Sequence, residues 1–456
     1  MTAIVAALLA LTCAAPAARA DTLIGALAEA YVSNPQLNAQ RAITRATDEN
    51  VPQALSGYRP TVTGTVTAGE QYQRTVTVQS GRTTVTKGAF APRSVGITGT
   101  QTLFNGFQTG NRVRQAEQQV SAARETLRLI EQNVLLNAAT AYMNLLRDTA
   151  ILELQRKNVE VLTEQLRQTR DRFAVGEVTR TDVAQAESRL AAGRSQVANA
   201  LSNYNASRAI YRQVIGSEPG RLSPASPVDR LSPRTLRKAI AVGRGQNPNV
   251  TAAMFGIDVQ ALQIKINEGS LYPTLTVSAS AQQNWDLGPT TVRQTNASVI
   301  GSLSVPIYQG GLPEAQIRSA KETLTQKRLD METARDQAQS NVTQSWGSLE
   351  AAKAQILATQ AQVQAAEIAL NGVREEARVG QRTTLDVLNA QQELVNARVA
   401  LVTAQRDRVV ASYTLLAAVG RLNPYVLRLP LSVYDPMVHY QQIRDAWIGV
   451  RTPDGK

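Results

Sequence analysis

Hydrophobic residues recur every three or four positions along one long stretch of the chain, residues 111–175. The first positions of this seam are Val113, Ala116, Val120, Ala123, Leu127, Ile130 and Val134. Alternating steps of three and four are typical of the a and d positions of a coiled coil. At about 1.5 Å per residue, roughly 65 residues span on the order of 100 Å. The pattern breaks after 175 and resumes over 180–215, so the sequence predicts a very long helix, a turn and a shorter return helix.

This helical hairpin occurs twice in the chain. Val175-Gly176 at the first turn recurs as Val379-Gly380 at the second. Three further pairs of segments have the same spacing: Phe104-Asn105-Gly106 and Tyr308-Gln309-Gly310, Thr181-Asp182-Val183 and Leu385-Asp386-Val387, and Gly216 and Gly420. A period of this length is far too long for a solenoid. The sequence therefore predicts a duplicated unit, whose second copy has helices at 312–378 and 383–419.

Ahead of each hairpin the period changes from near 3.6 to 2, which indicates β-strands. Four stretches alternate apolar residues with Thr, Ser and Gln: 60–74 and 92–104 in the first copy, and 273–284 and 295–307 in the second. Residues 71–91 are expected to form a polar loop or a strand extension. A half-buried strand of a soluble sandwich alternates in the same way, but a length of about 10–12 residues also suits a strand that crosses an outer membrane.

The number of strands favours the membrane interpretation. No other stretch of the chain is predicted to supply a second sheet. Four strands cannot close a barrel, since the smallest membrane barrels have about eight. Open sheet edges in lipid leave unpaired backbone groups that cost several kcal/mol each. The sequence therefore predicts a barrel that several copies of the chain share, and so an oligomer.

These elements divide the chain into five segments. The segments are a signal peptide at 1–20, a first repeat at 21–216, a connector rich in Pro and Ser at 217–233, a second repeat at 234–422, and an irregular C-terminal tail at 423–456. Shorter helices are expected ahead of the strands and hairpins, at 22–32, 36–55, 235–245 and 249–270.

The first 20 residues have the character of a secretory signal. They are rich in Ala, Leu and Val and end in Ala18-Arg19-Ala20, which matches an A-x-A cleavage site. The segment lacks a basic n-region, so the true start is expected upstream. Cys13, the single cysteine of the chain, lies within this segment. The processed protein is therefore expected to have no disulfide, which leaves packing and oligomerisation to stabilise it.

Composition and motifs exclude several other classes of function. The net charge of +12 would permit nucleic-acid binding, but the basic residues are interspersed with acidic ones and aromatic residues make up only 4%. The single histidine, His439, has no cysteine or acidic cluster at metal-ligand spacing. The sequence contains no G-x-S-x-G and no phosphate-binding glycine-rich loop. We therefore predict no nucleic-acid partner, no metal, no cofactor and no enzymatic activity.

Duplicated strand–strand–long helix–return helix units behind a signal peptide resemble the TolC-type outer-membrane efflux proteins. Local motifs in register agree with this resemblance over roughly residues 21–422. They are Tyr58-Arg59-Pro60-Thr61 and Leu271-Tyr272-Pro273-Thr274 where helix enters strand, Leu103-Phe104-Asn105-Gly106 and Val305-Pro306-Ile307-Tyr308-Gln309-Gly310-Gly311 where strand enters helix, and Arg172-Phe173-Ala174-Val175-Gly176 and Val379-Gly380-Gln381-Arg382-Thr383-Thr384-Leu385-Asp386-Val387-Leu388 at the hairpin tips.

The resemblance implies a mixed α/β membrane protein that works as a homotrimer. Three chains would form a 12-stranded β-barrel in contact with outer-membrane lipid and a 12-helix barrel that extends through the periplasm. The family serves as a passive exit duct for tripartite drug efflux and for type I secretion. Its members work with a periplasmic adaptor and with an inner-membrane transporter of the ABC, RND or MFS class, which supplies the energy. The sequence does not separate drug efflux from protein secretion.

The resemblance also assigns gate residues at the hairpin tips. Arg382 would pair with Thr181 and Asp182 of the neighbouring hairpin and hold the periplasmic entrance closed. Asp386 would belong to an acidic ring that narrows the aperture. Two positions depart from the family pattern: Ala377 replaces a tyrosine that ties the aperture shut, and Asn389 replaces an aspartate of a second ring. These departures predict a weaker latch.

Each of these residues also has a simpler interpretation. Asp182 and Asp386 follow a turn and lie in the first turn of a helix, where the N-terminal dipole favours a carboxylate. Arg382 would then be a solvated charge of little energetic value. Four residues at the tips, namely Val175, Gly176, Val379 and Gly380, are either contacts for an adaptor or plain hairpin punctuation.

A periplasmic adaptor or scaffold is the alternative function, because such proteins also use a long α-hairpin. An adaptor would have one hairpin flanked by compact β domains. Two hairpins and four strands of membrane-crossing length argue against it.

Overall fold

The computed structural model describes residues 22–288, 291–453 and 455. The predicted signal peptide lies outside the described residues. The chain forms two compact units, and each unit draws segments from both repeats. Of the described residues, the hairpin unit consists of those in 22–40, 127–250 and 335–434, and the sheet unit of those in 41–126, 251–334 and 435–455.

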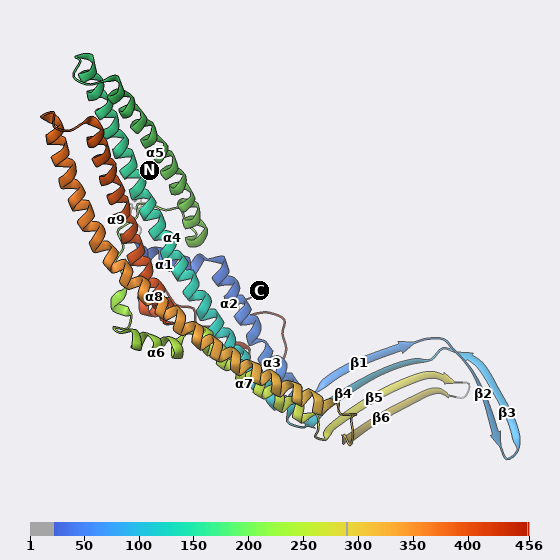
Figure 1. The fold of residues 1–456 in the computed structure, drawn as a ribbon. Coiled ribbons are helices and arrows are strands. Elements are labelled where there is room, and N and C mark those ends of the chain that lie inside the picture. Colours follow the sequence, from blue (N-terminus) through green and yellow to red (C-terminus); the bar gives the residue numbers. More distant parts are fainter. Residues whose placement is uncertain (1–21, 289–290, 454, 456) are drawn as a thin grey trace, which may run out of the picture. The chain divides into compact units, whose positions relative to one another are not determined.

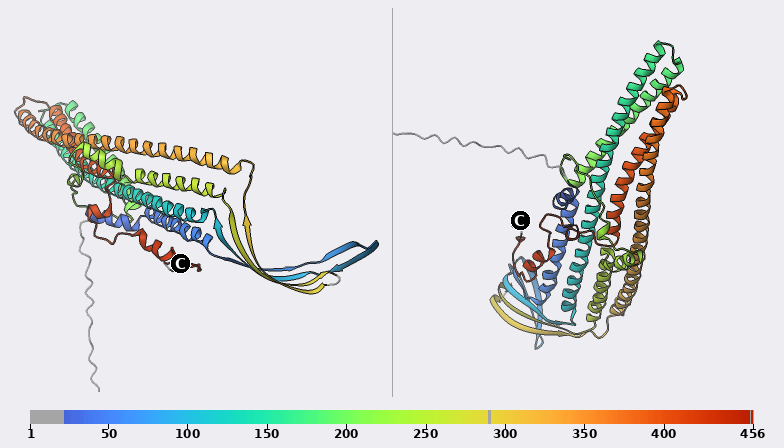
Figure 2. Two further views of the ribbon diagram at one scale, coloured as in Figure 1. Left: turned by 90° about the horizontal axis from the view of Figure 1, so that it is seen from below. Right: turned by 90° about the vertical axis from the view of Figure 1, so that its left-hand side faces the viewer.

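Two helical hairpins, one from each repeat, form most of the hairpin unit (Figure 1). In the first, α4 (Gln108–Ala174) is followed by α5 (Arg180–Ile215); in the second, α8 (Leu312–Arg378) is followed by α9 (Thr384–Ala418). Helices α4 and α8 each contain 67 residues, and their first turns belong to the sheet unit. Figure 2 shows the two helices of each pair side by side. These bounds lie within a few residues of those that the coiled-coil periodicity predicts.

The main hydrophobic core of the hairpin unit joins both hairpins to α1 (Leu23–Ser33) and α6 (Leu236–Gln246). Its largest buried side chains include Tyr31, Tyr142, Tyr211, Leu135, Leu415 and Leu416. The hydroxyl groups of two of the tyrosines donate hydrogen bonds. Tyr31 donates to the carboxylate of Glu131 at 2.9 Å, and Tyr142 donates to the backbone oxygen of Ser223 at 2.6 Å. Buried hydroxyl groups need such partners, so these bonds favour one rotation of the helices about their axes.

Shorter helices precede the strands of each repeat. They are α2 (Pro35–Asp48), α3 (Asn50–Leu55) and α7 (Pro248–Gly269), with 3-10 turns at Ser56–Tyr58 and Asp229–Leu231. The single helix expected at 36–55 is thus divided at Glu49, between α2 and α3.

One antiparallel sheet, built from both repeats, forms the strand layer of the sheet unit. Its strands β1 (Thr61–Ala68), β4 (Arg93–Asn105), β5 (Thr274–Gly288) and β6 (Thr291–Ser304) pair in the order β1-β4-β5-β6. The two repeats meet where β4 pairs with β5. In the described part of the chain, β1 and β6 each pair along one side only, so the sheet has two open edges.

The predictions for 60–74 as one strand and 71–91 as a polar loop or strand extension are wrong in part. The first strand ends at Ala68, and a separate two-stranded ribbon follows, formed by β2 (Gln71–Gln79) and β3 (Arg82–Phe90). Ser80 and Gly81, with φ of 50° and 78°, form its tight turn, as the twist of a hairpin favours. Every side chain of β2 is exposed, so the ribbon has no buried positions, and its polar residues suggested a loop.

The tail at 423–456 was predicted to be irregular, and this is also wrong in part. It contains α10 (Pro424–Leu427) and α11 (Pro436–Ile443), capped by the side chains of Asn423 and Asp435. Pro424 and Pro436 occupy the first turn of these helices, where a missing N–H costs nothing. Within the sheet unit, Tyr440 on α11 packs against a small apolar cluster that includes Val51 and Val120.

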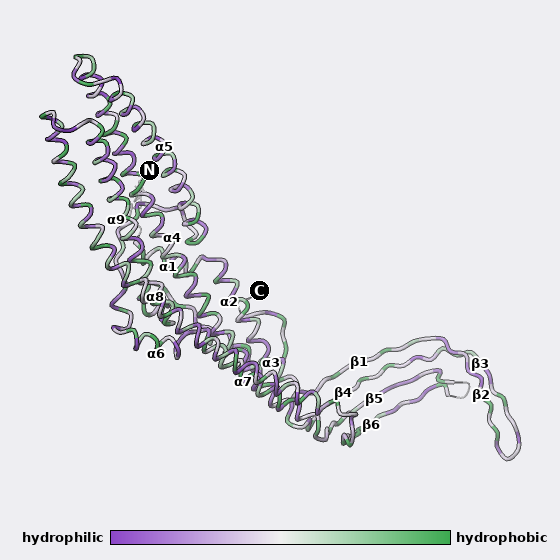
Figure 3. The backbone as a smooth tube through the Cα atoms, viewed as in Figure 1, coloured by the Kyte–Doolittle hydropathy of each residue, from purple (hydrophilic) through white to green (hydrophobic). Residues whose placement is uncertain are grey.

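Hydrophilic and hydrophobic residues are mixed along the long helices α4, α5, α8 and α9 (Figure 3). Among the described residues, no helix is both long enough and apolar enough to cross a membrane.

Candidate functional site

Both hairpin tips have the same backbone geometry, as the duplication predicts. At the first tip, Gly176 has φ of +79°, and its N–H donates to the oxygen of Phe173 at 3.0 Å; at the second, Gly380 has φ of +82°, and its N–H donates to the oxygen of Ala377 at 3.2 Å. Glycine at this helix-ending position avoids the steric cost of a left-handed conformation. The tips leave Val175 and Val379 73% and 70% exposed. Two apolar side chains are therefore presented to solvent at equivalent positions.

The predicted gate carboxylates Asp182 and Asp386 complete capping boxes at the start of the return helices. The Asp182 carboxylate accepts hydrogen bonds from the N–H and the hydroxyl of Thr179, at 2.8 and 2.7 Å. Asp386 accepts the equivalent bonds from Thr383, at 3.0 and 2.9 Å. In return, each aspartate N–H donates to the threonine hydroxyl. Within one chain, both carboxylates have the capping role that the simpler interpretation predicts.

The same hydrogen bonds lower the pKa of both aspartates. The hydroxyl of Thr179 contributes most to the shift at Asp182, and the N–H of Thr383 contributes most at Asp386. Arg382 lowers the pKa of Asp386 further by its charge. Hydrogen bonds donated to a carboxylate favour its charged form, so both side chains are anionic at neutral pH.

Arg382 lies at the second tip and pairs within its own hairpin. Its Nε donates to Glu376 at 2.8 Å, and this bond raises the pKa of the guanidinium. Within the described chain, Arg382 does not hydrogen bond to Thr181 or Asp182. Glu376 was not among the predicted site residues. Its partner lies six positions later and beyond the turn, so helical spacing alone gave no signal for the pair.

A buried apolar layer joins the two hairpins next to the tips. Leu388 of α9 is 2% exposed, and the side chains that complete the layer come from α4 and α5 of the first hairpin. They are Leu162, Leu166, Ala186 and Leu190, with Val159 and Val183 at the margin. This layer is the main apolar contact of the tip region, and any separation of the second hairpin from the first would expose it.

Polar contacts bracket this apolar layer. Next to Leu388, the predicted gate residue Asn389 accepts a hydrogen bond from Arg189 of α5 at 2.6 Å. Farther along α9, Gln391 donates to Asn158 of α4 at 3.3 Å. Sequence analysis did not single out Arg189 or Asn158, because their partners lie on another hairpin and depend on how the helices are rotated. The site thus consists of two capped tips and a layered contact between the hairpins.

The single histidine has a structural role. His439 Nδ1 lies 3.1 Å from the carboxylate of Asp48, and both side chains are buried in the sheet unit. Burial raises the pKa of Asp48, while His439 and Arg124 oppose that shift. The contact anchors α11 on the sheet unit. In the described ranges, no three His, Cys, Asp or Glu side chains are grouped closely enough to hold a metal ion.

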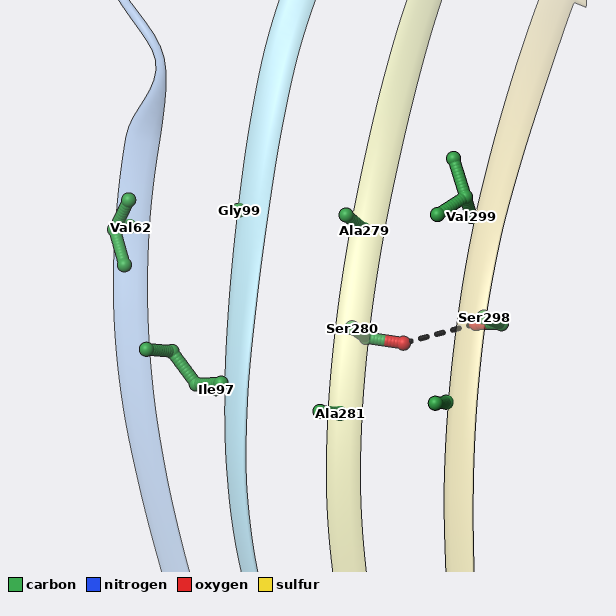
Figure 4. Close-up of a pocket in the computed structure, with 9 residues that line it drawn as sticks. Val62, Ile97, Gly99, Ala279, Ser280, Ala281, Ser298 and Val299 are labelled. Atoms are coloured by element: carbon green, nitrogen blue, oxygen red, sulfur yellow. Dashed lines mark hydrogen bonds between the residues drawn. The ribbon is translucent and has the colours of Figure 1, made fainter.

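One face of the sheet is apolar across all four strands. Val62, Ile97, Ala279 and Val299, one from each strand, line a shallow hollow on it (Figure 4). Neighbouring positions along the strands carry Ser and Thr, since successive side chains of a strand alternate between faces. An exposed apolar face on a sheet with open edges marks a surface that pairs with another chain or contacts a membrane.

Comparison with known proteins agrees with this architecture. The model of the family described as "Outer membrane efflux protein" matches residues 26–217 and again residues 242–421, once in each repeat. The outer membrane efflux protein BepC of Brucella suis biovar 1 (strain 1330) is 42% identical over 441 residues, which cover 96% of this chain and 94% of BepC. The outer membrane protein TolC of Escherichia coli (strain K12) is 25% identical over 422 residues, covering 89% of this chain and 83% of TolC.

Solved structures show the same fold. The crystal structure of the Campylobacter jejuni CmeC outer membrane channel superimposes with a TM-score of 0.76 at 15% sequence identity, covering 93% of this chain and 89% of CmeC. With two family matches, one per repeat, and a relative similar over nearly its whole length, the chain belongs to the outer membrane efflux protein family.

Proposed function

We propose that this outer-membrane channel protein functions as a homotrimer. Three four-stranded sheets would join edge to edge, β6 of one chain against β1 of the next, and close a 12-stranded barrel. Closure satisfies the backbone groups of both open edges, which lipid cannot do. The apolar face of the sheet would contact the lipid, and the Thr- and Ser-rich face would line the lumen. The sheet with two open edges and one apolar face is the observation that carries this proposal.

The proposed trimer is a passive exit duct rather than an enzyme. Six hairpins would surround a periplasmic tunnel, through which drugs or unfolded polypeptides pass from an inner-membrane ABC, RND or MFS transporter. The exposed valines Val175 and Val379 and the glycine turns beside them would receive a periplasmic adaptor. Whether the system exports small molecules or proteins depends on those partners.

We further propose that the hairpin tips form the gate. In the closed trimer, Arg382 would turn toward Thr181 and Asp182 of a neighbouring hairpin, in competition with its present partner Glu376. Asp386 and Asn389 would face the aperture. Opening would move the second hairpin away from the first, which requires the Leu388 layer to come apart.

Single-channel recording in planar bilayers tests the duct and the gate together. The processed wild-type protein is expected to show a small conductance, because the entrance is closed. Arg382→Ser is expected to raise the conductance. Arg378→Ser is the matched control, since Arg378 is also an exposed arginine at this tip and pairs with Glu375.

An absence of channels in wild-type preparations would contradict the proposed function as an exit duct. If channels form but Arg382→Ser and Arg378→Ser conduct alike, the gate assignment to Arg382 is wrong while the duct stands.

A further inference from the structure

The β2–β3 ribbon keeps the register of the β1–β4 pair, although residues 69–70 and 91–92 between them lie outside the strands. Ala68 pairs with Arg93 at the end of the sheet, and Gln71 pairs with Phe90 at the start of the ribbon. Between them, the N–H of Gly69 donates to the oxygen of Pro92 at 3.1 Å. No residue is inserted on either side, so the register is the same throughout. Since a shift of one residue would exchange the faces, each face of the sheet continues as the same face of the ribbon.

The apolar face of the sheet therefore leads into a defined face of the ribbon. Following alternate residues from Val62 and Val66 along the strand gives Ala68 and, just before the ribbon, Glu70; within the ribbon it gives Tyr72, then Arg74, then two valines. The residues paired with these ribbon positions, in order, are Ala89, Lys87, Val85 and Thr83. We call this the cationic face of the ribbon; its apolar members are exposed, Tyr72 by 67%. The opposite face carries threonine pairs, among them Thr75 with Thr86.

Two like charges lie directly opposite each other on the cationic face. Arg74 pairs with Lys87 across the ribbon, and like charges at such positions are destabilising. In the described chain neither side chain has an acidic partner. The ribbon sequence, 71–90, contains no Asp or Glu at all. An anion between the two side chains would remove this repulsion.

We propose that the cationic face binds the phosphate groups of anionic lipids at the outer surface of the membrane. This inference rests on the proposed function, which turns the apolar face toward lipid. The eight residues of β1 extend about 27 Å, or roughly 20 Å when tilted, close to the height of the apolar band of a membrane barrel. The residues just beyond β1, starting near Tyr72, therefore reach the head-group zone, where aromatic side chains are enriched.

The ribbon is specific to the first repeat. The equivalent connection in the second repeat is short, since Gly288 of β5 already pairs with Thr291 of β6. The trimer would thus carry three ribbons, each with one Arg74–Lys87 pair, at regular intervals around its outer rim. The third basic residue of the ribbon, Arg82 at the turn, pairs with Gln79 on the opposite face. Charges that served solubility alone could lie on either face, and Arg74 and Lys87 would not both need to lie on the face that continues the apolar surface.

Native mass spectrometry of the full processed protein, titrated with lipid A in detergent, tests this inference. Lipid A is a diphosphorylated glycolipid, and inorganic phosphate and phosphatidylcholine serve as separate arms. A basic residue near an anionic surface contributes about fivefold in affinity. We expect Arg74→Gln to weaken lipid A binding about fivefold, and the double variant with Lys87→Gln to weaken it about 30-fold.

The matched control is Arg82→Gln, which removes one positive charge from the other face of the same ribbon and is expected to leave lipid A binding unchanged. Arg74→Glu, which places opposite charges across the ribbon and relieves the repulsion, is expected to abolish binding while the ribbon stays folded. Phosphatidylcholine should bind the wild-type protein and the double variant alike.

Several results would overturn the inference. It fails if the double variant and Arg82→Gln bind lipid A equally, or if inorganic phosphate competes as well as the lipid, which would indicate a simple anion site. The same samples report trimer mass and conductance. If trimers conduct but substitution of Arg74 and Lys87 leaves lipid A binding unchanged, only this inference fails. If no conducting trimer forms, the proposed function fails as well.

Discussion

Truncation of Leu388 should release the second hairpin from the first. Leu388 is 2% exposed and lies in an apolar layer whose other buried members, all from the first hairpin, are Leu162, Leu166, Leu190 and Ala186. Replacing a buried leucine with alanine costs about 2–5 kcal/mol, depending on how far the site can collapse. Ala186 is too small to fill the space, and helix backbones in a coiled coil move little, so we expect a cost in the upper half of this range.

The substitution destabilises the state in which the two hairpins are packed together. It does not affect a state in which the Leu388 layer is already separated. A change of 2 kcal/mol shifts the equilibrium about 30-fold, and 5 kcal/mol several thousand-fold. In a trimer each of the three chains contributes one layer, so the effect on a concerted opening is larger still. We expect Leu388→Ala channels to open more often or to conduct more than the wild type in planar bilayers.

Leu349→Ala is the matched control. Leu349 is 3% exposed and belongs to the main core of the hairpin unit, not to the Leu388 layer. The Leu349→Ala substitution should lower the melting temperature of the protein about as much as Leu388→Ala does, and it should leave the conductance unchanged. If both variants fold and conduct like the wild type, or if both raise conductance equally, the Leu388 layer does not hold the gate closed.

Three further predictions concern the cap, a glycine and the tail. Asp182→Ala removes the N3 carboxylate of the capping box; it should cost about 0.5 kcal/mol and speed amide hydrogen exchange in the first turn of α5; because the folded pKa of this carboxyl is lowered, the carboxylate should contribute above the unfolded pKa and its contribution should be lost as pH falls below about 4. Gly106→Ala should lower the melting temperature far more than Gly310→Ala, since both glycines have positive φ but only at Gly106 would a Cβ lie 2.1 Å from a backbone oxygen. His439→Ala leaves the buried carboxyl of Asp48 without its hydrogen-bond partner, so limited proteolysis should remove the segment after α11 faster than in the wild type; equal rates would mean that the contact does not anchor it.

The coiled-coil period and the duplication predicted the long hairpins because each depends on many residues at once. A seam of seven or more apolar positions is insensitive to any single exception. The ribbon at 71–90 and α11 were missed for the opposite reason. The ribbon has no buried side to mark its period, and the prolines that begin α10 and α11 indicate a helix start as well as a break.

At the site, local patterns were predictable and contacts between helices were not. A threonine followed three positions later by an aspartate is the signature of a capping box, and it places Asp182 and Asp386 correctly in the first turn. The partner of Asn389 could not be predicted in the same way. Arg189 lies in the other repeat, and the bond depends on the rotation of α5 against α9, which the packing of Leu388 sets.

The mass of the detergent-solubilised, processed protein tests the central claim most directly. A sheet with two open edges cannot be stable in lipid as a single copy, and four strands per chain close a 12-stranded barrel only with three chains. Native mass spectrometry should therefore give a single species of three times the chain mass. A monomer that remains folded in the membrane extract, or a dimer, would contradict the account.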